Sequence, residues 1–126
     1  MKQTVCSVGD AILLERFPES YDITAIKKIL ESADARLFNL ENVLSDRPIY
    51  ASSYCGGTWL LAKEDTLDDT LSFGFNGCSF ANNHTMDFSY DGLFVLHCLK
   101  TLVENGKLLL PKENQRKSLT TIVIEE

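Results

Sequence analysis

The sequence contains no long apolar run. No stretch approaches the roughly 20 apolar residues that a membrane span requires, and Met1 to Cys6 lead into a β-branched segment without an apolar leader. Basic residues are also scarce, with 12 Lys and Arg against 18 Asp and Glu, so the formal net charge is −6. This balance argues against a nucleic acid or an anionic membrane as the main partner. We therefore expect a cytoplasmic protein without a membrane span or a nucleic-acid partner.

Histidine, cysteine and the familiar catalytic motifs are equally sparse. Only His84 and His97 carry imidazoles, and the four cysteines form no C-x-x-C pair. This spacing does not predict a zinc knot, and we expect reduced thiols that act as small apolar residues. The G-x-S-x-G, G-x-x-x-x-G-K, G-x-G-x-x-G and H-E-x-x-H signatures are all missing. The sequence thus lacks the usual marks of a serine hydrolase, a nucleotide-binding protein or a zincin.

Short apolar runs alternate with amphipathic segments along the chain. The predicted strands are 4–8, 35–38, 77–81 and 119–124. Helices are expected to begin at Asp22, Glu64 and Asp91, and Gly74 and Gly106 should end the second and third. The apolar residues predicted to share one face of the first helix are Ile23, Ile26, Ile29, Leu30 and Ala33. This alternation predicts a single α/β domain over 1–126, with a mostly parallel sheet and flanking helices.

Polar residues follow three of the predicted strands. They are Asp10, Asn39 with Glu41, and the run Asn82, Asn83 and His84, with Asp87 close behind. Ligands of parallel α/β sheets bind outside the carboxyl ends of the strands, so these residues should share one rim. Each also has an ordinary explanation: a turn Asp, a solvent-facing Glu, or Asn residues in Asx turns. Their convergence favours a site in which His84 acts as a proton donor or phosphate contact.

Four segments together resemble a known family. They are Val8-Gly9-Asp10, Phe38-Asn39-Leu40-Glu41, Gly74-Phe75-Asn76, and the run from Phe80 to Phe88. Their order and rough spacing are similar to those of the CapA-type capsule and poly-γ-glutamate synthesis proteins, which belong to the calcineurin-like metallophosphatase superfamily. The resemblance covers nearly the whole chain and fades after Gly106.

The resemblance implies a layered metallophosphatase-like sandwich that holds up to two divalent ions (Mn, Fe, Zn or Mg). Asp10, Glu41 and Asn83 match the metal ligands, and His84 matches the catalytic histidine. Asn39, Asn82 and Asp87 would support them. The implied reaction is metal-assisted hydrolysis of a phosphoester or a polyanionic polymer. The family's usual place at the cell envelope is an alternative to the cytoplasm.

The sequence also departs from the family pattern. Such domains are usually much longer, with further metal-binding histidines in their second half, and they tend to have glycine where this chain has Ser89. We therefore expect the N-terminal portion of a longer domain, with weak metal occupancy and an exposed sheet that favours self-association. Two alternatives stay open: a non-enzymatic remnant or interaction module, and a flavodoxin-like domain that binds a small ligand.

Overall fold

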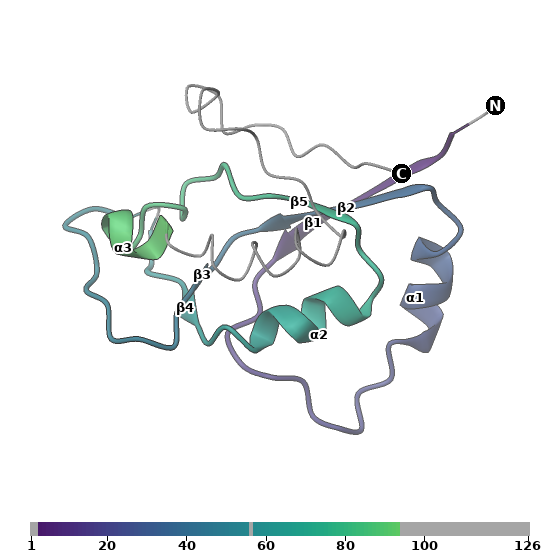
Figure 1. Ribbon diagram of the computed structural model, residues 1–126, viewed down its shortest axis with the longest axis horizontal. Coiled ribbons are helices and arrows are strands. Elements are labelled where there is room, and N and C mark those ends of the chain that lie inside the picture. The colour runs from purple at the N-terminus through teal and green to yellow at the C-terminus, as the bar shows by residue number, and fades with distance from the viewer. Residues whose placement is uncertain (1–2, 56, 94–126) are drawn as a thin grey trace.

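The computed structural model describes residues 3–55 and 57–93. Its main sheet has three strands, β1 (Val5–Ala11), β2 (Ala35–Leu40) and β5 (Gly77–Ser79), in the order β1-β2-β5. Both strand pairs are parallel, and helices α1 (Thr24–Leu30) and α2 (Thr66–Ser72) lie on one side of the sheet (Figure 1). The mixed α/β fold with parallel strands is as predicted.

Strand β1 is longer than expected. Its predicted end at Val8 is wrong, because the strand continues through Gly9 and Asp10 to Ala11. The pairing with β2 shifts between Ser7 and Asp10 and then resumes with Asp10 opposite Asn39. An irregularity of this kind re-aims the side chains that follow it. It therefore places Asp10 beside Asn39 at the carboxyl end of the sheet, inside a strand and not in the expected turn.

Strand β1 is also an edge of the described sheet. Val5 is 67% exposed on it, and Val8 is exposed as well. An unpaired strand edge with apolar residues can join a second chain. Self-association through this edge stays a prediction.

Two further strands, β3 (Val43–Leu44) and β4 (Leu61–Ala62), pair in parallel as a separate small sheet. The sequence did not predict them, because two residues are too few to show a period. In the segment between them Leu60 is buried, whereas Trp59 is 48% exposed and its indole N–H donates to the carbonyl of Ser52. Strands β3 and β4 thus lie in the connection between the end of β2 and the start of α2.

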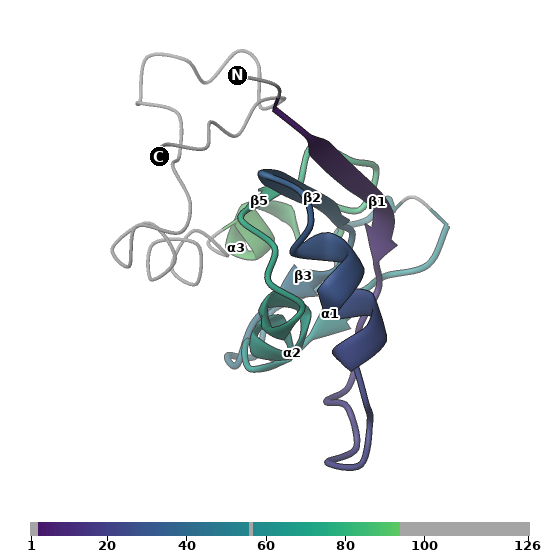
Figure 2. The same cartoon turned by 90° about the vertical axis from the view of Figure 1, so that its right-hand side faces the viewer.

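The first helix buries less of its apolar face than its spacing predicted. The N-cap of this helix is Ile23, so the prediction that the helix begins at Asp22 is wrong by one residue; Asp22 still contacts the helix start, since the backbone N–H of Thr24 donates to Asp22 Oδ1 at 2.9 Å. Leu30 and Ala33 are buried, but Ile26 and Ile29 are 48% and 67% exposed. The apolar face is therefore only partly packed, with its buried residues Leu30 at the end of the helix and Ala33 in the turn after it. Figure 2 shows the course of α1 between the 12–22 segment and β2.

The core lies between the sheet and α2. Its buried residues are Phe38, Leu40, Leu44, Ala62, Leu67 and Cys78. Burial raises the pKa of the Cys78 thiol to about 12, so this cysteine is a protonated apolar core residue. Cys6 and Cys55 are also free thiols, and Gly74 ends the α2 segment with φ +88°, both as expected.

The last described element is α3 (Ser89–Leu93). Asp91 lies in its first turn, so the prediction that Asp91 precedes the helix is wrong by two residues. The rest of the predicted helix to Gly106, His97, Cys98 and the strand 119–124 lie outside the described residues. Among the helices that are described, none has the length and apolar character to cross a membrane.

The segment between β1 and α1, residues 12–22, is held against α2 by Arg16. Its guanidinium donates to both carboxylate oxygens of Asp69, at 2.6 and 2.7 Å, and the backbone N–H of Phe17 adds a third bond at 2.8 Å. The side-chain hydrogen bond from Arg16 holds the pKa of Asp69 below its usual range. The ion pair therefore fixes the segment that follows Asp10.

We expect Asp69→Asn to destabilise the protein at pH 7 and to do so much less at acidic pH. A carboxyl with a lowered folded-state pKa stabilises the fold above its ordinary value of ~3.9, and this contribution is lost as the pH falls through the folded-state value. Urea denaturation at several pH values measures the effect. Asp68→Asn, on the adjacent exposed carboxylate, is the control. A loss that is equally large at pH 7 and pH 3 would contradict this account.

Candidate functional site

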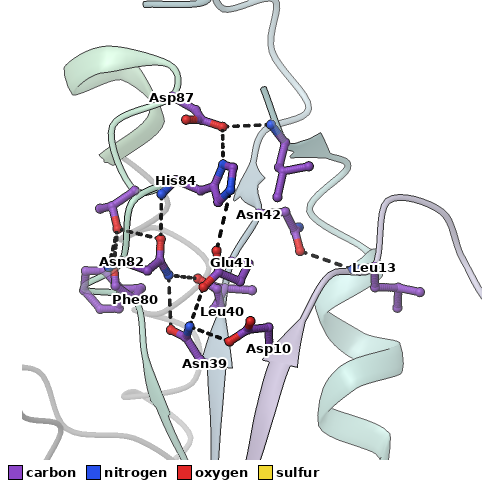
Figure 3. A network of polar contacts seen from close by, with 12 residues as sticks. Asp10, Leu13, Asn39, Leu40, Glu41, Asn42, Phe80, Asn82, His84 and Asp87 are labelled. Carbon is purple, nitrogen blue, oxygen red and sulfur yellow. Dashed lines mark hydrogen bonds and ion pairs between the residues drawn. The ribbon is translucent and has the colours of Figure 1, made fainter. Parts of the chain in front are cut away.

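Six polar side chains meet at the carboxyl ends of the main sheet (Figure 3). Asp10 comes from β1, Asn39 and Glu41 come from β2 and the residue after it, and Asn82, His84 and Asp87 come from the segment after β5. Because both strand pairs are parallel, these ends lie side by side. The structure thus brings together all but one of the residues singled out from the sequence.

Asn39 connects the two acidic residues. Its Nδ2 donates to Asp10 Oδ1 at 2.9 Å and to Glu41 Oε1 at 2.5 Å. Glu41 is only 7% exposed, whereas Asp10 is exposed to solvent. A buried carboxylate needs a donor, and the amide of Asn39 supplies one without adding a charge. Both carboxylates are therefore held toward a single point.

Asn82 ties the segment after β5 to the end of β2. Its Nδ2 donates to Asn39 Oδ1 at 3.1 Å and to the carbonyl of Leu40 at 2.7 Å. Its Oδ1 accepts the backbone N–H of His84 at 3.0 Å, which is an Asx-type contact two residues ahead. Thr85 Oγ1 donates to the carbonyl of Phe80 and closes the same turn. Asn82 thus forms the ordinary turn that its sequence allows and also contacts the site.

His84 lies between two carboxylates. Its Nδ1 is 2.9 Å from Asp87 Oδ2, and its Nε2 is 3.9 Å from Glu41 Oε2. The side chains of His84 and Glu41 are 12% and 8% exposed, and that of Asp87 is fully buried. The imidazole is therefore largely enclosed and faces acidic groups through both ring nitrogens.

Asn83 lies apart from this network. It is exposed, and within 3–55 and 57–93 its side chain has no hydrogen bond. Sequence reasoning missed Asn42, which is 4% exposed and accepts the backbone N–H of Leu13 at 3.3 Å. Asn42 links the end of β2 to the 12–22 segment. An Asn after a Glu at a strand end carries no distinctive sequence signal, so this role could be found only from the structure.

The donor types at the site suit a divalent ion. Carboxylate oxygens are preferred ligands of Mg and Mn, and imidazole suits Zn and Fe. The NH₂ group of Asn39, a positively polarised group, lies between Asp10 and Glu41 where both carboxylates converge. In the part of the chain that the structure describes, no three His, Cys, Asp or Glu side chains gather closely enough to form a complete set of ligands. The residues present thus fit two ligands of an ion, Asp10 and Glu41.

Backbone strain occurs next to the site, at Ser89. Its φ of +54° is in the left-handed region, which non-glycine residues rarely adopt. The turn allows α3 to start two residues after the buried Asp87, and α3 then packs closely on β3, where a Cβ at Gly92 would be 3.0 Å from Val43 Cγ1. A glycine at position 89 would make this turn without strain.

A family model matches most of this chain. The model of a family described as "Bacterial capsule synthesis protein PGA_cap" matches residues 4–108, which include every residue of the site. No curated protein matches significantly.

We expect Asn39→Leu to lower the free energy of unfolding by about 1–3 kcal/mol, because Glu41 then loses its amide donor while it stays buried. Asn83→Leu is the matched control and should change stability by less than about 0.5 kcal/mol, since Asn83 is exposed. Chemical denaturation of both variants gives the comparison. Equal losses would show that the Asn39 bridge does not stabilise the fold.

Relief of strain at Ser89 is tested separately. Ser89→Gly should raise the free energy of unfolding by about 0.5–1 kcal/mol, since glycine adopts the left-handed region without a steric penalty but has more entropy to lose on folding. Ser89→Ala keeps the Cβ and should give no gain. If the glycine variant is no more stable than the alanine variant, the strain is not significant.

Proposed function

The chain belongs to the bacterial capsule synthesis protein family PGA_cap, and we propose that its strand-end network is the metal-dependent hydrolase site of a metallophosphatase-like domain. The substrate we propose is a phosphoester or a polyanionic capsule polymer such as poly-γ-glutamate. One observation carries the proposal: Asp10, in β1, and Glu41, directly after β2, converge on the single amide nitrogen of Asn39.

Asp10 and Glu41 are the residues that would hold a divalent ion. When bound, such an ion polarises a phosphoryl or carbonyl oxygen and lowers the pKa of water. Asn39 keeps the two carboxylates close together, since both accept from its Nδ2. Two carboxylates this close repel each other unless a donor or a cation lies between them. Asn39 supplies the donor, and a divalent ion held by the same two carboxylates would offset their repulsion further.

His84 supplies the second chemical function. Nδ1 of its ring contacts Asp87, which leaves Nε2 on the side of Glu41, 3.9 Å from Oε2. A hydrogen on an imidazole nitrogen can be passed to a leaving oxygen, and general acid catalysis of this kind typically contributes about 10²–10⁴-fold to a rate. In this proposal the imidazolium form of His84 gives its Nε2 hydrogen to the leaving oxygen and keeps its Nδ1 hydrogen on Asp87, while Asp10 and Glu41 would hold the divalent ion.

Charge also supports a role for a cation. The chain has a formal net charge of −6, and the site itself presents Asp10 and Glu41. A polyanionic substrate would be repelled by this surface unless bound cations neutralised the carboxylates. Bound metal ions would remove this repulsion between the acidic site and a polyanionic substrate. An acidic site without metal ions would keep it.

We expect the purified chain to bind Mn²⁺, and Asp10→Asn and Glu41→Gln each to weaken that binding at least tenfold, as loss of a ligand should. The matched controls are Asp68→Asn and Glu31→Gln, which change exposed carboxylates outside the site. Calorimetric titration measures the affinity. Hydrolysis of a phosphodiester and of poly-γ-glutamate is then assayed with Mn²⁺ and with a chelator.

Turnover that requires Mn²⁺ and is lost in Asp10→Asn, Glu41→Gln and His84→Gln would support the proposal. A folded protein that binds no Mn²⁺, or binds it equally well in the site and control variants, would overturn it and favour an interaction module.

A further inference from the structure

Most of the connection from β3 to β4 carries no charge. Residues 48–62 include no Lys, Arg, Asp, Glu or His, although 24% of the whole chain is charged. Of the four Tyr and one Trp in the chain, this segment contains Tyr50, Tyr54 and Trp59. All three are exposed to solvent, Tyr50 and Tyr54 at 87% and 84%. We call these three residues the aromatic surface.

The aromatic surface is linked to the strand-end site by hydrogen bonds through Ser52. The backbone N–H of Ser52 donates to the carbonyl of Asp87 at 2.7 Å, and its own carbonyl accepts the indole N–H of Trp59 at 3.2 Å. Ser52 Oγ also donates to the carbonyl of Tyr54. Asp87 in turn contacts His84. Only Ser52 and Asp87 therefore separate Trp59 from the imidazole of the site, and Figure 1 shows this connection on the same side of the molecule as α3.

The rings of the aromatic surface are not used by the core. The ring-to-ring contacts in the described part of the chain involve only residues outside this surface: Phe17, Tyr21, Phe38, Phe73 and Phe75. Trp59 spends its N–H on Ser52 and is still 48% exposed. Tyr and Trp side chains are stiff, so they offer a large contact area at a low cost in conformational entropy. Neighbouring exposed rings of this kind indicate a binding surface.

We propose that the aromatic surface binds an uncharged saccharide, which stacks on Trp59 and Tyr54. The C–H groups of a sugar ring carry partial positive charge and the face of an aromatic ring is negative, so the two attract each other. Ser53 and Thr58 are exposed in the same segment, and their hydroxyls can both donate to and accept from the hydroxyls of a sugar. Rings and hydroxyls without charges match the chemistry of a neutral sugar.

Other partners fit the same surface less well. A polyanion such as poly-γ-glutamate is bound through Lys or Arg, and residues 48–62 contain neither. A protein partner needs a packed apolar centre. The large apolar side chains exposed on residues 48–55 and 57–62 are all aromatic, because Ile49 is only partly exposed and Leu60 is buried. The charge and the composition of the surface therefore both favour a saccharide.

The position of the aromatic surface also bears on the substrate. A saccharide stacked on Trp59 would extend toward His84, so a phosphoester carried on a saccharide is the substrate class that fits both surfaces. This assignment of the saccharide to the substrate rests on the proposed function, whereas saccharide binding itself does not.

Tryptophan fluorescence tests the proposal directly, because Trp59 is the only tryptophan of the chain. The full chain is titrated in the presence of a chelator with uncharged oligosaccharides of glucose, of galactose and of N-acetylglucosamine, and separately with poly-γ-glutamate. We expect a saturable change in fluorescence with at least one of the oligosaccharides and no change with poly-γ-glutamate.

Variants locate the binding. In calorimetric titration with the oligosaccharide that responds, we expect Trp59→Ala to weaken the affinity about tenfold and Tyr54→Ala about fivefold, since each loses a stacking face. Tyr21→Ala is the matched control, because Tyr21 is an exposed tyrosine of the 12–22 segment, and its affinity should be unchanged. Circular dichroism establishes whether each variant is folded. If Trp59→Ala does not fold, Tyr54→Ala decides, since its side chain is exposed.

No response to any of the oligosaccharides would overturn the inference. A response to poly-γ-glutamate alone, or an equal loss of affinity in Tyr54→Ala and Tyr21→Ala, would overturn it as well. The titration needs neither metal nor turnover. Failure of Mn²⁺ binding or hydrolysis would therefore defeat the proposed function and leave saccharide binding intact, whereas loss of saccharide binding in a chain that binds Mn²⁺ would defeat only this inference.

Discussion

The parallel pairing of β2 with both of its neighbours is the constraint on which the site depends. It aligns the carboxyl ends of β1, β2 and β5, so that Asp10, Asn39 and Asn82, from three segments distant in the sequence, join one hydrogen-bond network. The register shift in β1 then sets Asp10 opposite Asn39. With a regular strand in place of this irregularity, Asp10 would not have the same alignment with β2, and the two acidic residues would not meet at one amide.

Neutral amides are the means by which this structure tolerates its clustered acidic groups. Asn39 donates to two carboxylates, Asn82 holds Asn39 and the end of β2, and Asn42 holds the 12–22 segment. Amides can donate and accept at once, so they link acidic groups without adding charge. Asp87 has no amide partner: its Oδ2 accepts from the backbone N–H of Leu60 and contacts the imidazole of His84. Asp10, Glu41 and Asp87 therefore each have a hydrogen-bond partner, and Asp10 is also exposed to solvent.

The family assignment and the geometry of the site support different statements about this protein. The match to residues 4–108 establishes membership of a capsule synthesis family. The proposed chemistry depends on the separate observation that Asp10, Glu41 and His84 lie at one rim. A fold can host many reactions, so the function must be argued from the site. Here the site offers two converging carboxylates and an enclosed imidazole, a combination suited to metal-assisted hydrolysis.

The sequence alone determined the fold class, the order of the main strands and helices, and the rim at which polar residues gather. These features depend on periodicity, on glycine and Asp at element ends, and on the rule that parallel strands align their carboxyl ends. The resemblance added the roles expected of Asp10, Glu41 and His84, which stay predictions.

Other features were decided only in three dimensions: the extension of β1 to Ala11, the exposure of Ile26 and Ile29, the β3–β4 pair, and the separation of Asn83 from the network. Asp87 also became the most buried polar residue only through packing. The physical reason is that strand register, burial and hydrogen-bond partners depend on residues distant in sequence, whereas local patterns report only on near neighbours.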